Sequence, residues 1–372
     1  MPALQRGRAR TLTLLFVLIT SLYMTTYSAH VESGDARRLL DTVSSLVDHG
    51  DFLLDLSAWQ FAPEEFDVTN PLPLQSGNVE PLQVLAAAPL YLLAKLTPLG
   101  LVHTAYLLNV LVGALAGCVL YSYALTLGYR ERTAVLAAMV FAACTVMWVY
   151  SKTFFREPLM LLLLLTSAYL IERLRLRNYQ SPPLLILLVL AIVALVLTKA
   201  SAVISLPALL ILAVPSVRGV NWRRVAMGGG LILVLLAVVF VLLALFGEAV
   251  GAGSRFNVLR ILTEGTPRYF LTALHAYLVS PGGSVWGTSP ILLLTVPGIV
   301  LLLRRGQIRY PVAILVMVVG FAGAYAWLNG PHWFGGLSFP PRFLIQVIPF
   351  VLIGALPVLD RVAAGRSKWW WI

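Results

Sequence analysis

The sequence predicts an all-α, polytopic bundle of about ten transmembrane helices, with one further helix at the outer surface of the membrane. Three observations predict this fold class: the composition, the long apolar runs and the sidedness of the basic residues. The chain of 372 residues is 59% hydrophobic and 12% charged, with a mean hydropathy of +0.86. A soluble domain is about half apolar and about a quarter charged, so lipid is expected to solvate much of this chain.

Apolar runs follow one another along the chain, each long enough to cross a bilayer with its flanking residues. They are residues 11–29, 99–127, 133–150, 158–174, 182–198, 200–217, 225–246, 288–303, 310–328 and 342–359. The first run could be a signal peptide, but it is long for one and no small-x-small cleavage site precedes His30. We interpret it as a retained helix, and residues 1–372 as a single membrane domain.

Basic residues gather on alternate segments between these runs, which predicts the orientation of the chain. With the N-terminus inside, the inner segments contain few acidic residues. Their basic residues are Arg6, Arg8, Arg10, Arg130, Arg132, Arg173, Arg175, Arg177, Arg218, Arg223, Arg224, Arg304, Arg305, Arg309, Arg361, Arg366 and Lys368. Short cytoplasmic loops collect Lys and Arg, so both termini are predicted to be cytoplasmic. The same rule accounts for the net charge of +11 without a nucleic-acid partner.

The two large segments on the outer side are residues 30–98 and residues 247–287. Within the first, residues 80–96 are apolar enough to form a short helix. If that helix crossed the membrane, every later loop would invert and the basic segments would face outward. Pro89 in its middle and Lys95 near its end favour a helix that lies in the outer interface.

Acidic residues at the outer ends of the apolar runs are the first candidates for chemistry, because ionisable groups are costly there. Glu32 and Asp35 follow the first run and would share a helical face. A partly shielded carboxylate there could have a raised pKa and act as a general base; equally, Ser33 and Asp35 suit the start of a helix. Glu157 precedes Pro158, so it is either a helix N-terminal acid or a second carboxylate of an outer cavity.

Basic residues on the same side are candidates for binding a lipid phosphate. Lys199 lies where one apolar run ends and the next begins, and Arg342 opens the last run from outside. Each could reach to the interface for its own solvation, or could hold a phosphate. Lys152 and Arg156 could add to the same positively charged rim.

Other reactive groups give weaker signals. His332 and Glu80 are candidate contacts for a sugar or an acceptor, although a lone histidine is more often structural. No metal-ligand spacing, P-loop or dinucleotide fingerprint is present, so no cofactor is predicted; a weakly held divalent cation stays open. Cys118 and Cys144 lie inside apolar runs and are interpreted as small buried hydrophobic residues.

Five stretches of the chain, in order, resemble elements of one group of membrane enzymes. They are SGDARRLLDTVSSLVDHGDF at 33–52, EPLQVLAAAPLYLLAKL at 80–96, YSKTFFREPLMLLLLLTSAYLIERLR at 150–175, VSPGGSVWGTSPILLLTVPGIVLLLRR at 279–305, and WFGGLSFPPRFLIQVIPFVLIGALPVL at 333–359. These are similar to the acidic first loop, the juxtamembrane helix, the second acidic site, the Ser-Pro-Gly loop and the last helix of the GT-C superfamily. That superfamily of membrane glycosyltransferases includes protein O-mannosyltransferases and aminoarabinose transferases.

The resemblance implies transfer of a sugar from a polyprenyl-phosphate donor to a glycan, lipid or protein acceptor outside the cytoplasm, usually with inversion. Asp35 then matches the catalytic base and Glu157 the second acidic residue, while Lys199 and Arg342 are expected donor-phosphate contacts. Ala36 follows Asp35 where many relatives have a second acid, so the role of base is shared between Asp35 and Glu32.

Two further departures affect what the resemblance implies. Pro340 and Pro341 precede Arg342 where many relatives have Gly-Pro. A C-terminal soluble domain is not expected, so acceptor recognition would come from the outer loops or a partner. Two other functions stay open: a secondary transporter, which would keep charges at the midplane and show an internal repeat, and a non-catalytic GT-C-like assembly protein.

Overall fold

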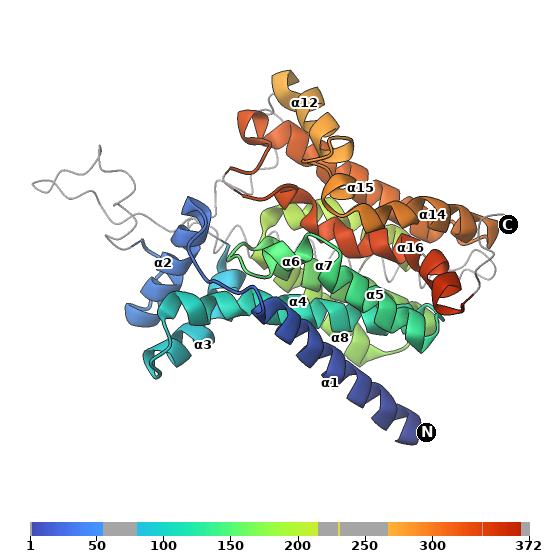
Figure 1. Ribbon diagram of the computed structural model, residues 1–372, viewed down its shortest axis with the longest axis horizontal. Coiled ribbons are helices and arrows are strands. Elements are labelled where there is room, and N and C mark those ends of the chain that lie inside the picture. Colours follow the sequence, from blue (N-terminus) through green and yellow to red (C-terminus); the bar gives the residue numbers. More distant parts are fainter. Residues whose placement is uncertain (1, 55–79, 215–229, 231–266, 337, 366–372) are drawn as a thin grey trace, which may run out of the picture.

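The structure, a computed structural model, describes residues 2–54, 80–214, 267–336 and 338–365, together with Gly230. The elements of these residues are all helices, as the composition predicts (Figure 1). The predicted run 225–246 lies outside the described residues apart from Gly230, as do parts of both predicted outer segments.

The other predicted runs are all present as helices. They are α1 (Pro2–Met24), α4 (Leu101–Thr126), α5 (Glu131–Ala143) with α6 (Met147–Tyr150), α7 (Glu157–Leu176), α8 (Pro182–Thr198), η3 (Ala200–Ser205) with α9 (Leu206–Ala213), η5 (Pro290–Leu294) with α14 (Thr295–Arg304), α15 (Arg309–Leu328), and η7 (Arg342–Val347) with α16 (Ile348–Ala363). Among the described residues, three helices have both the length and the apolar composition to cross a membrane: Leu101–Thr126, Arg309–Leu328 and Arg342–Ala363. The all-α membrane fold is therefore confirmed, while the count of about ten crossings stays a prediction.

Polar side chains interrupt the predicted run 133–150, which divides into α5 and α6. The hydroxyl of Thr145 donates to the carbonyl of Phe141, 2.6 Å away, and so turns back onto its own helix. Ser289, from another segment, accepts the backbone N–H of Val146 at 2.9 Å. Because this N–H is satisfied by a side chain, the chain can leave the helical path there without a buried unpaired donor.

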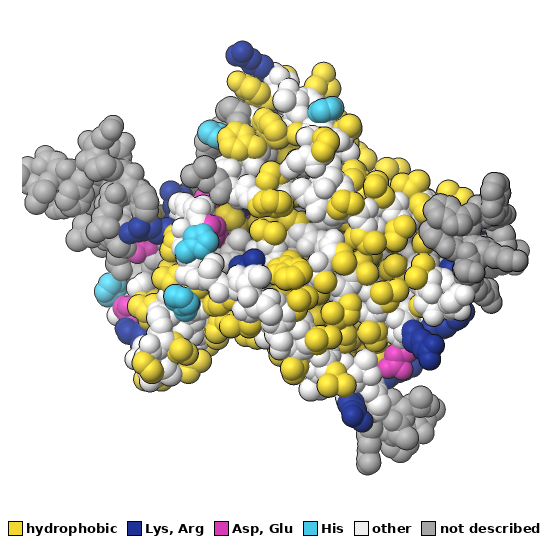
Figure 2. Space-filling view, in the orientation of Figure 1, with side chains coloured by type: hydrophobic (Ala, Val, Ile, Leu, Met, Phe, Trp, Pro, Cys, Tyr) yellow, Lys and Arg dark blue, Asp and Glu magenta, His cyan; other side chains and the backbone are white. Residues whose placement is uncertain are grey.

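Charged residues gather at the two opposite ends of the bundle. At one end, Thr133 donates to Asp360 at 2.7 Å, and Thr11 donates to Glu131 at 2.9 Å. These two hydrogen bonds join segments that are predicted to lie on the cytoplasmic side. At the other end, Arg342 pairs with Asp35 at 2.8 Å. Figure 2 shows a broad band of hydrophobic side chains between these ends. Among the described residues, these contacts thus group the segments by end in the way that the charge pattern predicts.

The helix predicted over residues 80–96 is α3 (Pro81–Lys95), and both its ends contact outer elements. Glu80, its N-cap residue, forms an ion pair with Arg156, just before α7. At the other end, Lys95 pairs with Asp48, the last residue of α2 (Gly34–Asp48). Both ends of α3 thus contact segments that are predicted to lie on the outer side of the membrane. This agrees with the prediction of a helix at the outer surface.

Cysteine labelling tests which end faces the cytoplasm. Arg305 and Arg38 are exposed at opposite ends of the molecule. In a chain whose own two cysteines are replaced by serine, we expect a membrane-impermeant maleimide to label Arg38→Cys in intact cells. Arg305→Cys should react only after the cells are permeabilised, because the basic turn is predicted to be cytoplasmic. Labelling of Arg305→Cys in intact cells would invert the topology.

Candidate active site

The centre of the site is the fully buried carboxylate of Glu157, the first residue of α7. Pro158 follows it in the first turn, where proline fits a helix and an acid suits the macrodipole. Oε1 of Glu157 accepts from Nζ of Lys199 at 2.7 Å and from Nε of Arg342 at 3.1 Å. The two cations therefore neutralise a carboxylate that would be costly to bury alone. The interpretation of Glu157 as a helix N-terminal acid is confirmed, while its role as a second carboxylate of an outer cavity stays a prediction.

Lys199 lies at the junction between α8 and η3, where the backbone is extended. Its ammonium is 5.4 Å from the ring centroid of Tyr325 and 5.2 Å from that of Phe343. Cation–π contacts of this kind stabilise a largely desolvated ammonium. The lysine therefore points into the bundle towards Glu157, and the interfacial alternative is wrong for this residue.

Arg342 connects the buried carboxylate to the water-facing one. Its Nη1 lies 2.8 Å from Oδ2 of Asp35, and the same nitrogen donates to the carbonyl of Gly335 at 3.3 Å. The guanidinium also stacks on Phe155, 3.8 Å from the ring centroid. The side chain of Arg342 is 6% exposed, whereas that of Asp35 is 53% exposed. One guanidinium thus bridges an acid in the protein interior and an acid open to solvent.

Asp35 lies in the first turn of α2, after Ser33. Ser33 is the N-cap, and its hydroxyl accepts the backbone N–H of Ala36 at 3.2 Å, so the predicted helix start is confirmed. Partial burial raises the pKa of Asp35, but the charge and the hydrogen bond of Arg342 outweigh it, so the pKa lies below its ordinary value. The expected raised pKa is therefore not found at Asp35. The Asp35–Arg342 pair is lost only when the pH falls through this lowered pKa.

Glu32 has the raised pKa that was expected of an acid in this loop. Burial raises it, although the carboxylate accepts from the backbone N–H of Phe154 and from the hydroxyl of Tyr106, each at 2.9 Å. These two donors hold Glu32 against the turn before α7. It does not join the Glu157–Arg342–Asp35 chain of contacts, so the geometry favours Asp35 over Glu32 as the acid nearest to the cations.

Arg156 and Glu80 meet each other in the structure. They form a buried ion pair, and Oε1 of Glu80 also accepts the backbone N–H of Ala200 at 3.2 Å. Arg156, predicted as a phosphate contact, and Glu80, predicted as a sugar contact, thus connect α3, α7 and the segment after Lys199. This arrangement supports the walls of the site.

Lys152 and His332 lie outside the central cluster. Nζ of Lys152 donates to the hydroxyl of Thr26 at 3.1 Å, beyond the end of α1. His332 is exposed at the end of η6 (Gly330–His332). That loop still reaches the site through Gly335, whose carbonyl accepts from Arg342. Their predicted roles in donor and acceptor binding stay predictions.

Several uncharged residues that position the site were missed from the sequence. The amide of Asn109 in α4 donates to the carbonyls of Thr153 and Phe155, both at 2.8 Å, and so fixes the turn that carries Phe155. The hydroxyl of Tyr150 donates to the carbonyl of Phe339. An asparagine inside an apolar run is a usable signal, because an amide in a membrane-spanning helix needs a partner.

The central cluster brings two cations and two carboxylates together. Lys199 and Arg342 are cations with defined geometry, while Oε2 of Glu157 is buried with no hydrogen-bond partner among the described residues. The described residues hold no group of three or more His, Cys, Asp or Glu side chains that could bind a metal. The arrangement therefore combines charge for a phosphate with carboxylates for hydroxyl groups.

Removal of the Tyr106 hydroxyl tests the hydrogen bond to Glu32. We expect Tyr106→Phe to destabilise the protein by about 1 kcal/mol, because a partly buried carboxylate loses a donor. The pKa of Glu32 should rise further, since that bond favours its charged form. Thermal unfolding in detergent measures the loss. Tyr121→Phe is the matched control, since Tyr121 donates to the exposed Glu131; equal effects in both variants would contradict the prediction.

Comparison with known proteins gives no matching family model and no matching curated sequence. Two solved structures have a similar fold. The first is ArnT from Cupriavidus metallidurans bound to undecaprenyl phosphate, with a TM-score of 0.57 and 15% identity over 97% of this chain and 60% of that one. The second is the archaeal oligosaccharyltransferase AglB from Archaeoglobus fulgidus in complex with an inhibitory peptide and a dolichol-phosphate, with a TM-score of 0.55 and 14% identity over 96% of this chain and 51% of that one.

The chain thus spans little more than half the length of these two proteins, and nearly all of it aligns with them. At such low identity the likeness concerns the fold. It agrees with the resemblance carried by the five sequence stretches and with the helical bundle described above. The chain therefore has the GT-C fold of membrane glycosyltransferases.

Proposed function

We propose that this protein transfers a glycosyl group from a polyprenyl-phosphate-linked sugar to an acceptor hydroxyl on the extracytoplasmic face of the cell membrane, with inversion at the anomeric carbon. The observation that carries this proposal is the chain of contacts from Lys199 through Glu157 and Arg342 to Asp35. It lies at the predicted outer end of a GT-C fold, where a lipid-linked donor can meet an acceptor.

The donor phosphate is assigned to Lys199 and Arg342. Both are held in place by carboxylate and aromatic contacts, so little reorganisation is needed when an anion arrives. Arg342 can bind two phosphate oxygens with its fork of donors, and Lys199 adds a point charge. Both cations also stabilise the negative charge that the phosphate gains as it leaves.

The reaction is a single displacement. The acceptor oxygen attacks the anomeric carbon, the bond between that carbon and the phosphate oxygen breaks, and its electron pair leaves with the polyprenyl phosphate. The acceptor proton passes to Asp35, which is half-exposed and reachable from the aqueous side. Oε2 of Glu157, buried without a donor, can accept a hydrogen bond from a sugar or acceptor hydroxyl.

Donor binding also has a consequence for Asp35. A phosphate on Arg342 competes with the carboxylate that now pairs with it at 2.8 Å. Once Arg342 turns to the phosphate, the influence that lowers the pKa of Asp35 weakens, and Asp35 becomes a stronger base. The protein would thus activate its base when the donor is in place.

The position of the charges argues against a transporter. Transporters keep ionisable groups near the membrane midplane, whereas here the paired charges lie at the two ends of the helices. A non-catalytic GT-C-like protein remains the second candidate, motivated by Ala36, which stands where many relatives have a second acid.

The test is transfer of a labelled sugar by the purified full chain in liposomes. We expect radiolabel to move from polyprenyl-phosphate mannose, or another monosaccharide donor of that type, into lipid, glycan or protein of an added membrane extract. The control lacks the extract, and a second control contains Lys199→Met in place of the natural chain. Release of free sugar alone, or equal labelling with Lys199→Met, would contradict the proposal. Donor binding without transfer would favour the non-catalytic candidate.

A further inference from the structure

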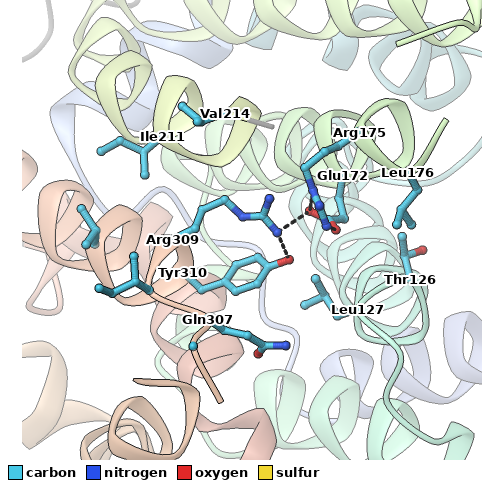
Figure 3. A pocket seen from close by; sticks show the side chains of 13 residues that line it. Thr126, Leu127, Glu172, Arg175, Leu176, Ile211, Val214, Gln307, Arg309 and Tyr310 are labelled. Atoms are coloured by element: carbon cyan, nitrogen blue, oxygen red, sulfur yellow. Dashed lines mark hydrogen bonds and ion pairs between the residues drawn. The ribbon is translucent and has the colours of Figure 1, made fainter. Parts of the chain in front are cut away.

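A charged cavity lies at the end of α7 that is opposite to Glu157, and Figure 3 shows the side chains that line it. It has a volume of about 620 Å³. It is formed by the ends of α4, α7 and α9 and by the start of α15. Glu157 and Glu172 lie on the same helix about 22 Å apart at the usual helical rise, so the two sites are separate.

Two guanidinium groups share one carboxylate in this cavity. Glu172 is 2% exposed and accepts from Nε of Arg175 at 3.2 Å, while Nη2 of Arg309 lies 3.6 Å from its Oε2. Nη2 of Arg309 also donates to the hydroxyl of Tyr310 at 2.7 Å. Figure 3 shows these four side chains turned towards one another. With one acid for two cations, the cluster keeps an excess positive charge.

Arg309 has a donor left over. Its Nε is buried and has no hydrogen-bond partner among the described residues, although its Nη2 contacts both Glu172 and Tyr310. A buried donor without a partner costs about 1–3 kcal/mol. The Arg309 side chain as a whole is 19% exposed, so an anion that enters the cavity can reach its guanidinium and neutralise the excess charge.

The other walls of the cavity are apolar. Leu127, Leu176, Ile211, Val214 and Val312 line it beside the charged cluster. A small inorganic anion would leave these apolar side chains without a contact. An amphiphile would contact both the arginines and the apolar walls. The predicted topology places this end of the helices at the inner membrane surface, at the height of lipid headgroups.

We propose that this cavity binds the phosphate of an anionic membrane lipid from the cytoplasmic leaflet. The phosphate lies against Arg309 and Arg175, and the glycerol and first acyl carbons lie against the apolar walls. Glu172 competes with the phosphate for the two arginines and limits the net charge of the site. The proposal does not depend on sugar transfer, because the cavity and the Glu157 cluster share no residue.

The test is lipid binding by the purified full chain in a neutral detergent. The probe is fluorescent phosphatidylglycerol, with phosphatidylcholine of the same acyl chains and inorganic phosphate as competitors. We expect saturable binding of phosphatidylglycerol that is about tenfold tighter than that of phosphatidylcholine, and that weakens as salt is raised. Inorganic phosphate at millimolar concentration should compete poorly. Equal affinity for the two lipids, or full displacement by phosphate at the same concentration as lipid, would overturn the proposal.

Three variants separate binding from a purely structural role of the cluster. Arg309→Gln should weaken phosphatidylglycerol binding about tenfold, because one charge-assisted contact is lost. Glu172→Gln should strengthen binding, because it frees both arginines. Arg132→Gln, an exposed arginine of the same end that does not line the cavity, should bind as the natural chain does. A loss in both Arg309→Gln and Glu172→Gln would show that the ion pairs serve structure alone and would overturn the proposal. If either variant fails to fold, the preference of the natural chain for phosphatidylglycerol over phosphatidylcholine still tests the proposal.

Discussion

Asp35→Asn is expected to abolish sugar transfer while the chain stays folded. The substitution keeps the size of the side chain and removes its ability to take a proton from the acceptor. Loss of a general base typically lowers the rate by about 10²–10⁴-fold. The fold should tolerate the change, since Asp35 is half-exposed and Arg342 keeps its contacts with Glu157 and Gly335. Initial rates in liposomes and the unfolding midpoint in detergent measure the two effects.

The matched control for this variant is Asp48→Asn, on the same helix. Asp48 pairs with Lys95 at the surface, far along α2 from Arg342, so transfer should be unchanged. Glu32→Gln completes the comparison. It should retain most activity if Asp35 is the base, and would lose it if Glu32 serves instead. Full transfer by Asp35→Asn would remove Asp35 from the mechanism.

Hydropathy predicted most of the helices of this fold because lipid leaves few alternatives to a continuous helix. The run 310–328 corresponds to α15 and the run 99–127 to α4, each within two residues at either end. The run 133–150 was predicted as unbroken, and the structure divides it after Ala143. Near this break the N–H of Val146 donates to Ser289, and no local pattern reveals a partner so far along the chain.

The sequence predicted on which side of the membrane each site residue lies, but not the residue with which it pairs. Alternation of loops placed Asp35, Glu157, Lys199 and Arg342 together, and the structure joins these four through ion pairs. The same reasoning assigned Arg156 and Glu80 to ligands, whereas they pair with each other. Topology fixes only the end at which a residue lies. The direction in which its side chain points depends on helix rotation, which packing decides.

Glu157→Gln is expected to have the largest effect on stability. The variant leaves Lys199 and Arg342 buried beside a neutral amide, and an uncompensated buried charge costs about 3–5 kcal/mol. The water-facing Asp35 offsets part of this cost for Arg342, whereas the ion pair of Lys199 in the described residues is with Glu157. We therefore expect an unfolding midpoint lower by several degrees, together with loss of sugar transfer because both phosphate ligands lose their anchor.

A double variant distinguishes charge imbalance from loss of packing. Lys199→Met, added to Glu157→Gln, removes one of the two stranded cations and keeps the length of the side chain near Tyr325 and Phe343. Because the remaining Arg342 still pairs with Asp35, the double variant should be more stable than Glu157→Gln alone. Arg132→Gln, which neutralises an exposed charge at the other end, should change stability by no more than about 0.5 kcal/mol. Additive losses in the double variant would mean that Lys199 stabilises the site without reference to Glu157, and the central pair would then be an incidental contact.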